Sequence, residues 1–401
     1  MKLKSPTGMV VALSILALLL SLLVFAYVAQ KQDGTIFSER AMLDGIWQNY
    51  KKEYLEAETF RALDKQQNNI TTSEGQSYSM LRAVWMDDKE TFDKSWQWTK
   101  DNLDRPDDRL FSWLFGERPD GSYGILTDRG GENSASDADS DIALALIFAA
   151  AKWQQQSYLA DAKAIVSDIW EHEIIEIQGK PYLAANNLEK FAESEILINP
   201  SYLSPYAYRI FSNINPENNW EGVIDSSYEI LEKSSVANLD KDFSAGLVPD
   251  WVAIDRFTGE LNRPQNPSLT TNYSFDAFRT PWRLALDFVW YKEERAKKIL
   301  ELFKFLEQEL QEKSLLYSSY SHDGIVLLQT ESPAAYGGNL GYFFIITPIQ
   351  ASNYAKNKLE SLYNPDTYNW KEKLGYYDSN WAWFGLGLYY GQLNNLTENL
   401  P

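Results

Sequence analysis

The fold is decided by the stretch Ala135-Ser136-Asp137-Ala138-Asp139-Ser140-Asp141-Ile142-Ala143, which places three carboxylates within five positions and then turns apolar. From its end, apolar side chains recur at helical spacing as far as Trp153. This spacing predicts a helix whose buried stripe begins just after the acids, with Asp137 and Asp141 on one face.

Acids at the start of a helix also have an ordinary structural explanation. They complement the positive end of the helix dipole, by about 0.3–1 kcal/mol each, and Ser134 or Ser136 is suited to cap this helix. That explanation accounts for Asp139 and Asp141 as well as a catalytic role does. Asp137 is the functional candidate because two further acidic segments have the same setting.

The first of these segments is Ser73-Glu74-Gly75-Gln76-Ser77-Tyr78-Ser79-Met80, which runs into apolar residues at helical spacing. Glu74 is therefore expected in a first helical turn, capped by Thr72 or Ser73. Gly75 lacks a side chain, which leaves room for a ligand to approach closely.

The other segment is Asn272-Tyr273-Ser274-Phe275-Asp276-Ala277-Phe278-Arg279-Thr280-Pro281-Trp282-Arg283. Thr280 followed by Pro281 predicts a helix start, so Asp276 is expected in the loop just before that helix. Arg279 is close enough to pair with Asp276, among aromatic side chains. A purely structural ion pair is the alternative.

Composition narrows the function. The 401 residues are 44% hydrophobic and 14% aromatic, enough for a large core. The net charge of -19 repels phosphate backbones and argues against a nucleic-acid partner. There is no cysteine and there are only two histidines, His172 and His322, which excludes thiolate chemistry and disfavours a catalytic triad or a histidine-rich metal site.

An apolar run from Met9 to Ala29 is long enough to cross a bilayer as one helix. Lys2 and Lys4 precede it and favour a cytoplasmic amino end. We expect an uncleaved signal anchor, with secretion after cleavage at Ala29 as the alternative. The predicted organisation is a cytoplasmic tail (1–8), a transmembrane signal anchor (9–29), a linker (30–37) and one exported catalytic domain (38–401), periplasmic or extracellular.

The exported region shows about a dozen helical patterns and little strand signal apart from residues 324–328. Without alternation of strands and helices, these patterns favour an all-α assembly, either a helical barrel or a solenoid. The predicted helices are 41–54, 74–85, 89–102, 139–153, 159–173, 205–214, 226–235, 281–290, 295–311, 333–347, 351–362 and 380–392.

In a barrel of helices, alternate loops gather at one rim, so the three acids at helix starts can converge. Convergent carboxylates with aromatic side chains, and without metal ligands, are typical of glycoside hydrolysis. One acid protonates the leaving oxygen and a second carboxylate activates water or attacks carbon. This chemistry needs no metal or cofactor.

Nearly the whole exported region resembles the glycoside hydrolases of family eight, a group with bacterial endoglucanases, chitosanases, licheninases and some xylanases. Residues 135–153 resemble the signature helix of that family position by position. Residues 73–78 and 276–283 resemble its other two catalytic segments, in the same order. Further similarity lies in Asn199-Pro200-Ser201-Tyr202, Trp113-Leu114-Phe115-Gly116 and Tyr376-Tyr377-Asp378-Ser379-Asn380.

The resemblance implies an (α/α)6 barrel, an open cleft along its mouth and an inverting mechanism. By position, Glu74 would be the general acid, Asp276 the general base, and Asp137 the carboxylate that binds and helps distort the sugar at the cleavage point.

The resemblance also implies substrate-binding residues. Tyr202 would lie near the attacking water, Arg279 would orient the base, and Trp113 would offer a stacking surface. Tyr377 is a further substrate-binding candidate.

The sequence around the three acids can be compared with the roles that the resemblance implies. Many cellulose-active members have Tyr immediately before the base, whereas this chain has Phe275. Asp137 in a first helical turn and Asp276 beside Arg279 are expected to stay ionised. Glu74 needs a raised pKa as a general acid, for which we expect desolvation or a neighbouring carboxylate such as Asp137.

The sequence therefore predicts a membrane-anchored endo-β-1,4-glucanase that cuts cellulose or a related exopolysaccharide, during secretion and beside polysaccharide synthase machinery. One alternative is the same chemistry on another polymer, such as an amino-sugar polymer of a biofilm. Others are a noncatalytic polysaccharide-binding partner and a helical scaffold whose acids are only caps.

Overall fold

A computed structural model describes residues 39–400. The predicted tail, signal anchor (9–29) and linker lie outside these residues. Within 39–400, no helix combines the length and the apolar character needed to cross a membrane.

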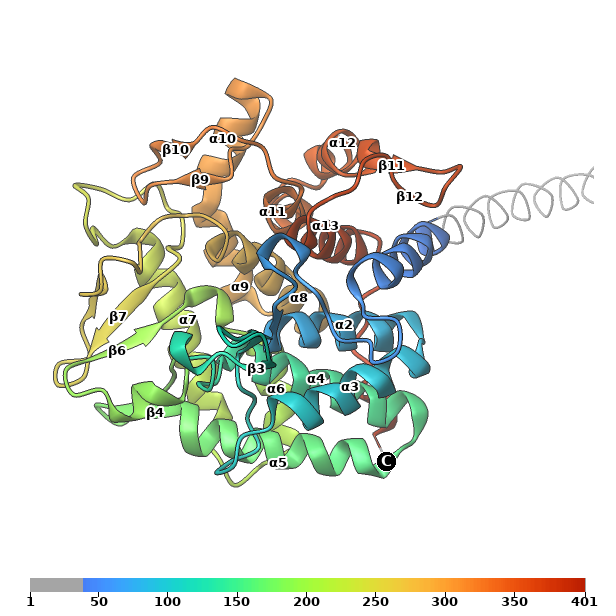
Figure 1. Cartoon of the computed structure of the whole chain (residues 1–401). Coiled ribbons are helices and arrows are strands. Elements are labelled where there is room, and N and C mark those ends of the chain that lie inside the picture. Colours follow the sequence, from blue (N-terminus) through green and yellow to red (C-terminus); the bar gives the residue numbers. More distant parts are fainter. Residues whose placement is uncertain (1–38, 401) are drawn as a thin grey trace, which may run out of the picture.

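Helices dominate the described part of the chain, as the all-α prediction requires (Figure 1). The first of them covers residues 39–54. The others are α2 (Ser73–Met86), α3 (Lys89–Leu103), α4 (Ser136–Trp153), α5 (Gln156–Glu173), α6 (Pro205–Ile214), α7 (Trp220–Val236), α8 (Thr280–Tyr291), α9 (Glu294–Leu300), α10 (Lys304–Lys313), α11 (Pro333–Ile346), α12 (Pro348–Lys358) and α13 (Tyr376–Tyr389).

Six helices follow one another around the interior, each packed on the next: α2, α4, α6, α8, α11 and α13. Side chains close the ring between α13 and α2, where Arg82 Nη1 donates to Asn380 Oδ1 at 3.1 Å and Tyr78 packs edge-on against Trp381. Five further helices pack outside this ring, α3 on α2, α5 on α4, α7 on α6, α9 on α8 and α12 on α11. The arrangement is consistent with an (α/α)6 barrel.

The interior position of α4 follows from its composition. Nearly every residue of the helix is buried, and a helix that is apolar on all sides belongs inside a protein. Close packing between α11 and α13 has another cause, because both contribute glycines. A Cβ on Gly385 would lie 2.4 Å from the carbonyl oxygen of Gly337, so only glycine allows these backbones to approach.

Short antiparallel strands connect the helices. Within residues 39–400, two three-stranded sheets are formed, by β1 (Thr71–Thr72), β2 (Leu114–Glu117) and β3 (Tyr123–Ile125), and by β6 (Glu195–Ile198), β7 (Val252–Asp255) and β8 (Leu261–Asn262). The same residues form three hairpins, β4 (Ile174–Ile177) with β5 (Lys180–Leu183), β9 (Ser319–Tyr320) with β10 (Val326–Leu328), and β11 (Tyr363–Asn364) with β12 (Asn369–Trp370).

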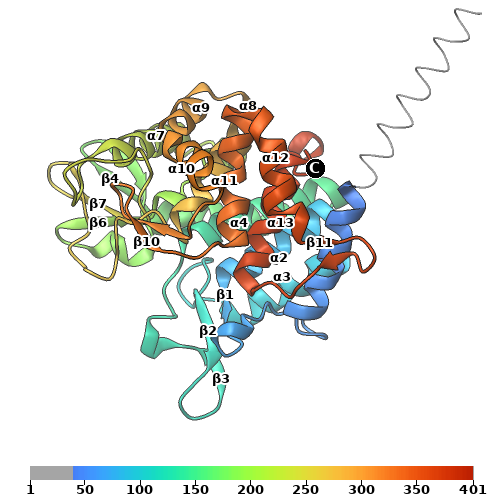
Figure 2. The same cartoon turned by 90° about the horizontal axis from the view of Figure 1, so that it is seen from above.

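The sheet β1–β3 leads directly into α2, and its β2–β3 hairpin projects from the body of the molecule (Figure 2). Short 3-10 turns complete the connections: η1 (Lys65–Gln67), η2 (Thr127–Arg129), η3 (Asn187–Phe191), η4 (Pro200–Tyr202), η5 (Ala277–Arg279), η6 (Glu301–Phe303), η7 (Glu360–Leu362) and η8 (Thr397–Asn399).

Every predicted helix has a counterpart, and the strand signal at 324–328 corresponds to β10. The prediction of one helix over 295–311 is wrong, because η6 separates α9 from α10. Most of the short strands were not predicted, since they span two to four residues and carry little periodic signal.

Candidate active site

Arg279 lies at the centre of the site, with 1% of the residue exposed. Its Nη1 donates to Glu74 and, at 3.3 Å, to Asp137 Oδ2, while its Nη2 donates to Asp276 Oδ1 at 2.5 Å. Nη2 also donates to Ser201 Oγ at 2.8 Å. One guanidinium thus joins all three predicted carboxylates, although the sequence had suggested only its pairing with Asp276.

The first turn of α2 presents Glu74, as predicted. Thr72 caps the helix, its Oγ1 accepting from Gly75 N at 3.0 Å. The suggestion that Gly75 leaves room for a ligand is wrong. A Cβ there would lie 2.1 Å from the hydroxyl of Tyr376, so the space is filled by the first residue of α13.

The first turn of α4 presents Asp137, but no side chain caps this helix. Both predicted capping serines bond elsewhere: Ser136 Oγ donates to Ala184 O at 2.7 Å, and Ser134 Oγ donates to Glu173 Oε1 at 2.6 Å. The start of α4 is therefore held by tertiary contacts, which a local sequence pattern does not contain.

A buried carboxyl that the sequence did not reveal, Asp250, holds the loop that carries Asp276. Its Oδ1 accepts from the backbone N–H groups of Ser274 at 3.2 Å and Ala277 at 2.8 Å, and Oδ2 accepts from the Ser274 hydroxyl. Because Asp250 lies 26 positions before Asp276 and outside any acidic cluster, no local signal marks it.

The other two acids of the 135–143 stretch, Asp139 and Asp141, each form a buried interaction. Asp141 forms a bidentate ion pair with Arg283, at 3.0 and 2.8 Å. Asp139 Oδ1 accepts from Phe111 N at 2.9 Å. Neither acid is merely a solvated complement to the helix dipole.

Burial and mutual repulsion set the acidity of the site. Burial raises the pKa of Glu74, and the charge of Asp276 raises it further, against the opposing effect of Arg279. The predicted desolvation is therefore present, but the neighbouring carboxylate is Asp276.

Burial, together with the charge of Glu74, also raises the pKa of Asp137 to about 7 despite the positive charge of Arg279. The expectation that a helix start keeps Asp137 fully ionised is wrong, because its 2% exposure outweighs the helix dipole.

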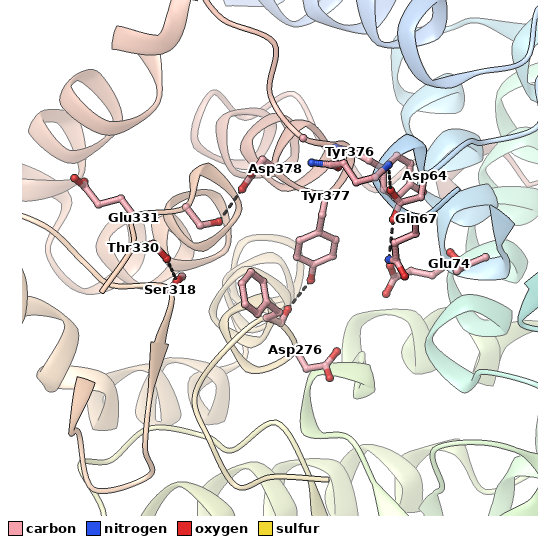
Figure 3. Close-up of a pocket in the computed structure, with 15 residues that line it drawn as sticks. Asp64, Gln67, Glu74, Asp276, Ser318, Thr330, Glu331, Tyr376, Tyr377 and Asp378 are labelled. Carbon is pink, nitrogen blue, oxygen red and sulfur yellow. Dashed lines mark hydrogen bonds between the residues drawn. The ribbon is translucent and has the colours of Figure 1, made fainter. Parts of the chain in front are cut away.

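A cavity of about 570 Å³ opens beside Glu74 and Asp276 (Figure 3). It lies among the loop before α2, the end of the 272–276 segment, and the starts of α11 and α13. Its other lining residues are Asp64, Gln66, Gln67, Thr72, Phe275, Ser318, Thr330, Glu331, Ser332, Gly375, Tyr376, Tyr377 and Asp378. Asp137 is not among the residues that line it.

Of the predicted binding residues, Tyr377 is among the residues that line this cavity, whereas Tyr202, Trp113 and Arg279 are not. Tyr377 lines the cavity and donates from its hydroxyl to Phe275 O at 2.5 Å. Phe275 is 45% exposed, and its ring packs edge-on against Tyr377. The aromatic side chain before Asp276 is thus in place without a hydroxyl.

Tyr202 and Trp113 do not line the cavity. The ring of Tyr202 lies under the guanidinium of Arg279, at 5.4 Å, and packs against Trp251. Trp113 is half-buried beside the start of α2, where its carbonyl accepts from Ser73 N at 3.1 Å and its Nε1 donates to Gly130 O at 2.8 Å.

Comparison with known proteins agrees with this arrangement. A family model described as glycosyl hydrolases family 8 matches residues 21–340. Endoglucanase A of Acetivibrio thermocellus is 28% identical over 265 residues, which cover 64% of this chain and 51% of that protein. The chain spans about half the length of the first curated relatives it matches.

Two solved structures share the fold. The endo-1,4-D-glucanase from Vibrio fischeri ES114 is 25% identical with a TM-score of 0.72, covering 86% of this chain and 94% of that one. A beta-1,3-1,4-glucanase from Paenibacillus sp. X4 is 22% identical with a TM-score of 0.73, covering 89% and 93%. Taken with the family match over most of its length, these findings place the chain in the glycosyl hydrolases of family 8.

Proposed function

We propose that this protein cleaves β-1,4-glucan internally with inversion, Glu74 acting as general acid and Asp276 as general base. The observation that carries the proposal is the binding of both carboxylates to one buried guanidinium, at the edge of a cavity that both line. The endoglucanase names of several relatives support the choice of substrate.

The environment of Glu74 suits the acid. A general acid must hold its proton until the glycosidic oxygen departs, and burial with a neighbouring negative charge raises its pKa. Asp276 suits the base because 33% of its side chain is exposed, leaving it access to water, while Arg279 fixes its orientation. In an inverting enzyme the two carboxyl groups stand roughly 6.5–9.5 Å apart to admit that water.

Asp137 would bind the sugar at the cleavage point through the same guanidinium network. Tyr202 lies against Arg279 on the side of Asp137 and Asp276, whose charges both act on its hydroxyl. We place the attacking water near this hydroxyl. Tyr377 would contact the sugar chain in the cavity, and Trp113 would stack on it beyond Glu74.

The test is release of reducing ends from soluble β-1,4-glucan. Glu74→Gln and Asp276→Asn are each expected to lower kcat at least 100-fold, since positioned acid–base groups contribute about 10²–10⁴-fold. Glu90→Gln is the matched control, because Glu90 also occupies a first helical turn but its side chain is 75% exposed. Equal loss in all three variants, or activity surviving in the first two, would reject the assignment.

Two further measurements define the reaction. NMR of the initial product should show the α-anomer from a β-linked substrate, whereas a β-anomer would contradict inversion. Viscosity should fall faster than reducing ends appear, because internal cuts shorten chains most.

A cationic polymer is the second candidate substrate. Five carboxylates line the cavity, and no lysine or arginine does so among its described lining residues; the acids are Asp64, Glu74, Asp276, Glu331 and Asp378. Glucosamine units carry ammonium groups that such a lining would attract. A higher kcat/KM on chitosan than on β-glucan, falling steeply with salt, would favour this candidate.

We propose that the 9–29 segment anchors the protein in a membrane, with the catalytic domain exported to trim a polysaccharide during its secretion. The support is the length of the apolar run and the preceding lysines. Fractionation of cells expressing the full chain should recover it with membranes and sensitive to external protease. Recovery in the soluble medium would indicate cleavage at Ala29 instead, and co-purification with a polysaccharide synthase would test the proposed partner.

A further inference from the structure

Two carboxyl groups outside the reaction centre face each other in the core. Asp139, from the first turn of α4, and Glu173, the last residue of α5, are each 0% exposed. Their side chains lie within hydrogen-bonding reach of each other. Two ionised carboxylates cannot bond, since each only accepts.

The other oxygen of each group is already satisfied. Asp139 Oδ1 accepts from Phe111 N at 2.9 Å, and Glu173 Oε1 accepts from the Ser134 hydroxyl at 2.6 Å. Asp139 Oδ2 and Glu173 Oε2 are buried and have no other hydrogen-bond partner among residues 39–400. A proton between these two oxygens would satisfy both.

The charges around the pair also favour one proton. Arg105 is the cation acting on both carboxyls. Its guanidinium is already paired with Asp108, at 2.9 and 3.0 Å, and donates to Glu132 O. With both carboxyls ionised, this group of four side chains would carry three negative charges against one positive charge.

The pair stands between segments that fix the start of α4. On one side Asp139 accepts a hydrogen bond from the backbone N–H of Phe111, and two residues later Trp113 N donates to Asn133 O. On the other side Glu173 holds Ser134, whose backbone N donates to Asn187 Oδ1 at 2.8 Å. Asp137 lies between these anchors, and α4 has no side-chain cap of its own.

We propose that Asp139 and Glu173 share one proton and that this pair positions Asp137 by holding the first turn of α4. Both are positioning residues, because neither touches Arg279 or lines the cavity. The effect on activity rests on the proposed function of Asp137. The shared proton does not, and it is measured separately through stability and infrared absorption.

A pH dependence with a definite sign follows. Burial is the main cause that raises the pKa of both groups above the ordinary values near 4. A carboxyl with a raised folded pKa contributes stability that is fully present below its unfolded pKa and is lost as pH rises through its folded pKa. The Tm should therefore fall as the pH rises above the ordinary carboxyl range, because the unfolded chain releases a proton that the folded pair retains.

Amide substitutions test the proton directly. In Glu173→Gln, the carboxamide oxygen still accepts from Ser134 while its NH2 group donates to Asp139, replacing the shared proton. Asp139→Asn does the same from the other side, keeping its oxygen on Phe111 N. In the double variant the two NH2 groups face each other with no acceptor between them.

The expected pattern is strongly non-additive. Each single variant should fold, keep kcat/KM within about threefold, and lose less Tm than the wild type between pH 6 and pH 9. The double variant should have a lower Tm than the sum of the single changes gives, and its kcat/KM should fall at least tenfold if it folds. Additive Tm changes, or single variants whose loss of Tm between pH 6 and pH 9 is as large as that of the wild type, would overturn the shared proton.

Two controls make the outcomes separable. Infrared spectra of the wild type should show a protonated carboxyl band at neutral pH that weakens in either single variant, and an unchanged band would contradict the proposal even if the double variant fails to fold. Glu309→Gln is a matched control, because Glu309 is a buried glutamate whose charge is paired with Lys313 at 2.8 Å. If the infrared and Tm measurements confirm the shared proton but the folded double variant keeps its kcat/KM, only the link to Asp137 is rejected.

Discussion

Two buried arginines of this protein occupy opposite environments. Arg279 binds three carboxylates, whereas Arg82 pairs with none in the described part of the chain and is surrounded by the rings of Trp47, Tyr50 and Trp383, at 4.8, 4.1 and 4.7 Å. Both lie within the helical ring, and both are at most 1% exposed.

The pKa values of the two guanidinium groups differ accordingly. Burial lowers the pKa of Arg82 to about 9, and within residues 39–400 its hydrogen-bonding partner is the amide oxygen of Asn380 rather than a carboxylate. The pKa of Arg279 is raised despite burial, because Tyr377, Tyr78 and the carboxylates surround it. Arg82, in a structural setting, is thus balanced by polarisable rings, while Arg279, in the proposed reaction centre, is balanced by groups that can exchange protons.

The largest expected effect is on the reaction centre. Arg279→Lys keeps the charge but loses the planar fork that reaches Glu74, Asp137 and Asp276 together. We expect kcat to fall about 100-fold or more, since small misplacement of catalytic groups has effects of that size. Steady-state kinetics measure it, with circular dichroism to show an intact fold; activity within fivefold of the wild type would contradict the bridging role.

A smaller effect on kcat is expected at Asp250, which holds the loop that carries the proposed base. Asp250→Asn keeps an oxygen for the backbone N–H groups of Ser274 and Ala277 but loses the acceptor for the Ser274 hydroxyl. We expect kcat to fall about tenfold, or roughly 1.4 kcal/mol, in line with one weakened hydrogen bond.

The pH dependence of that loss has a definite sign. Burial, reinforced by the charge of Asp276, raises the pKa of Asp250 to about 7, so the wild-type group is neutral below that pH and resembles the amide. The variant should therefore differ from the wild type mainly above pH 7. A constant ratio across the kcat–pH profile would contradict this account.

The smallest effect on catalysis is expected at the other arginine. Arg82→Met loses three cation–π contacts and leaves Asn380 Oδ1 without its donor, which costs stability. We expect the Tm to fall by several degrees while kcat changes less than twofold, because Arg82 does not line the cavity. A kcat loss comparable to that of Arg279→Lys would abolish the distinction between the two arginines.

Much of the fold could be read from the chain because its helices carry strong periodic signals. Every predicted helix has a counterpart, and the starts of α2 at Ser73 and of α8 at Thr280 lie within a residue of those predicted. The break at residues 301–303 was missed because the apolar pattern continues across it. The short strands were missed because segments of two to four residues carry little periodic signal.

The candidate site was predictable to a different extent. Glu74, Asp137 and Asp276 could be picked out because each lies in an ordered local context, a first helical turn or the loop before one. Asp250 and Glu173 could not, since neither lies in a recognisable motif and the partners of both lie between 24 and 39 positions away.

By itself the sequence determined which segments are helical and which three acids begin or precede them, because helix periodicity and capping are local properties. Only the tertiary structure decided that one arginine would join these acids, that Tyr376 would fill the space at Gly75, and that Asp137 would have a pKa of about 7. The physical reason is that charge pairing and desolvation depend on which distant side chains share a small volume, and the closure of the helical ring sets that volume.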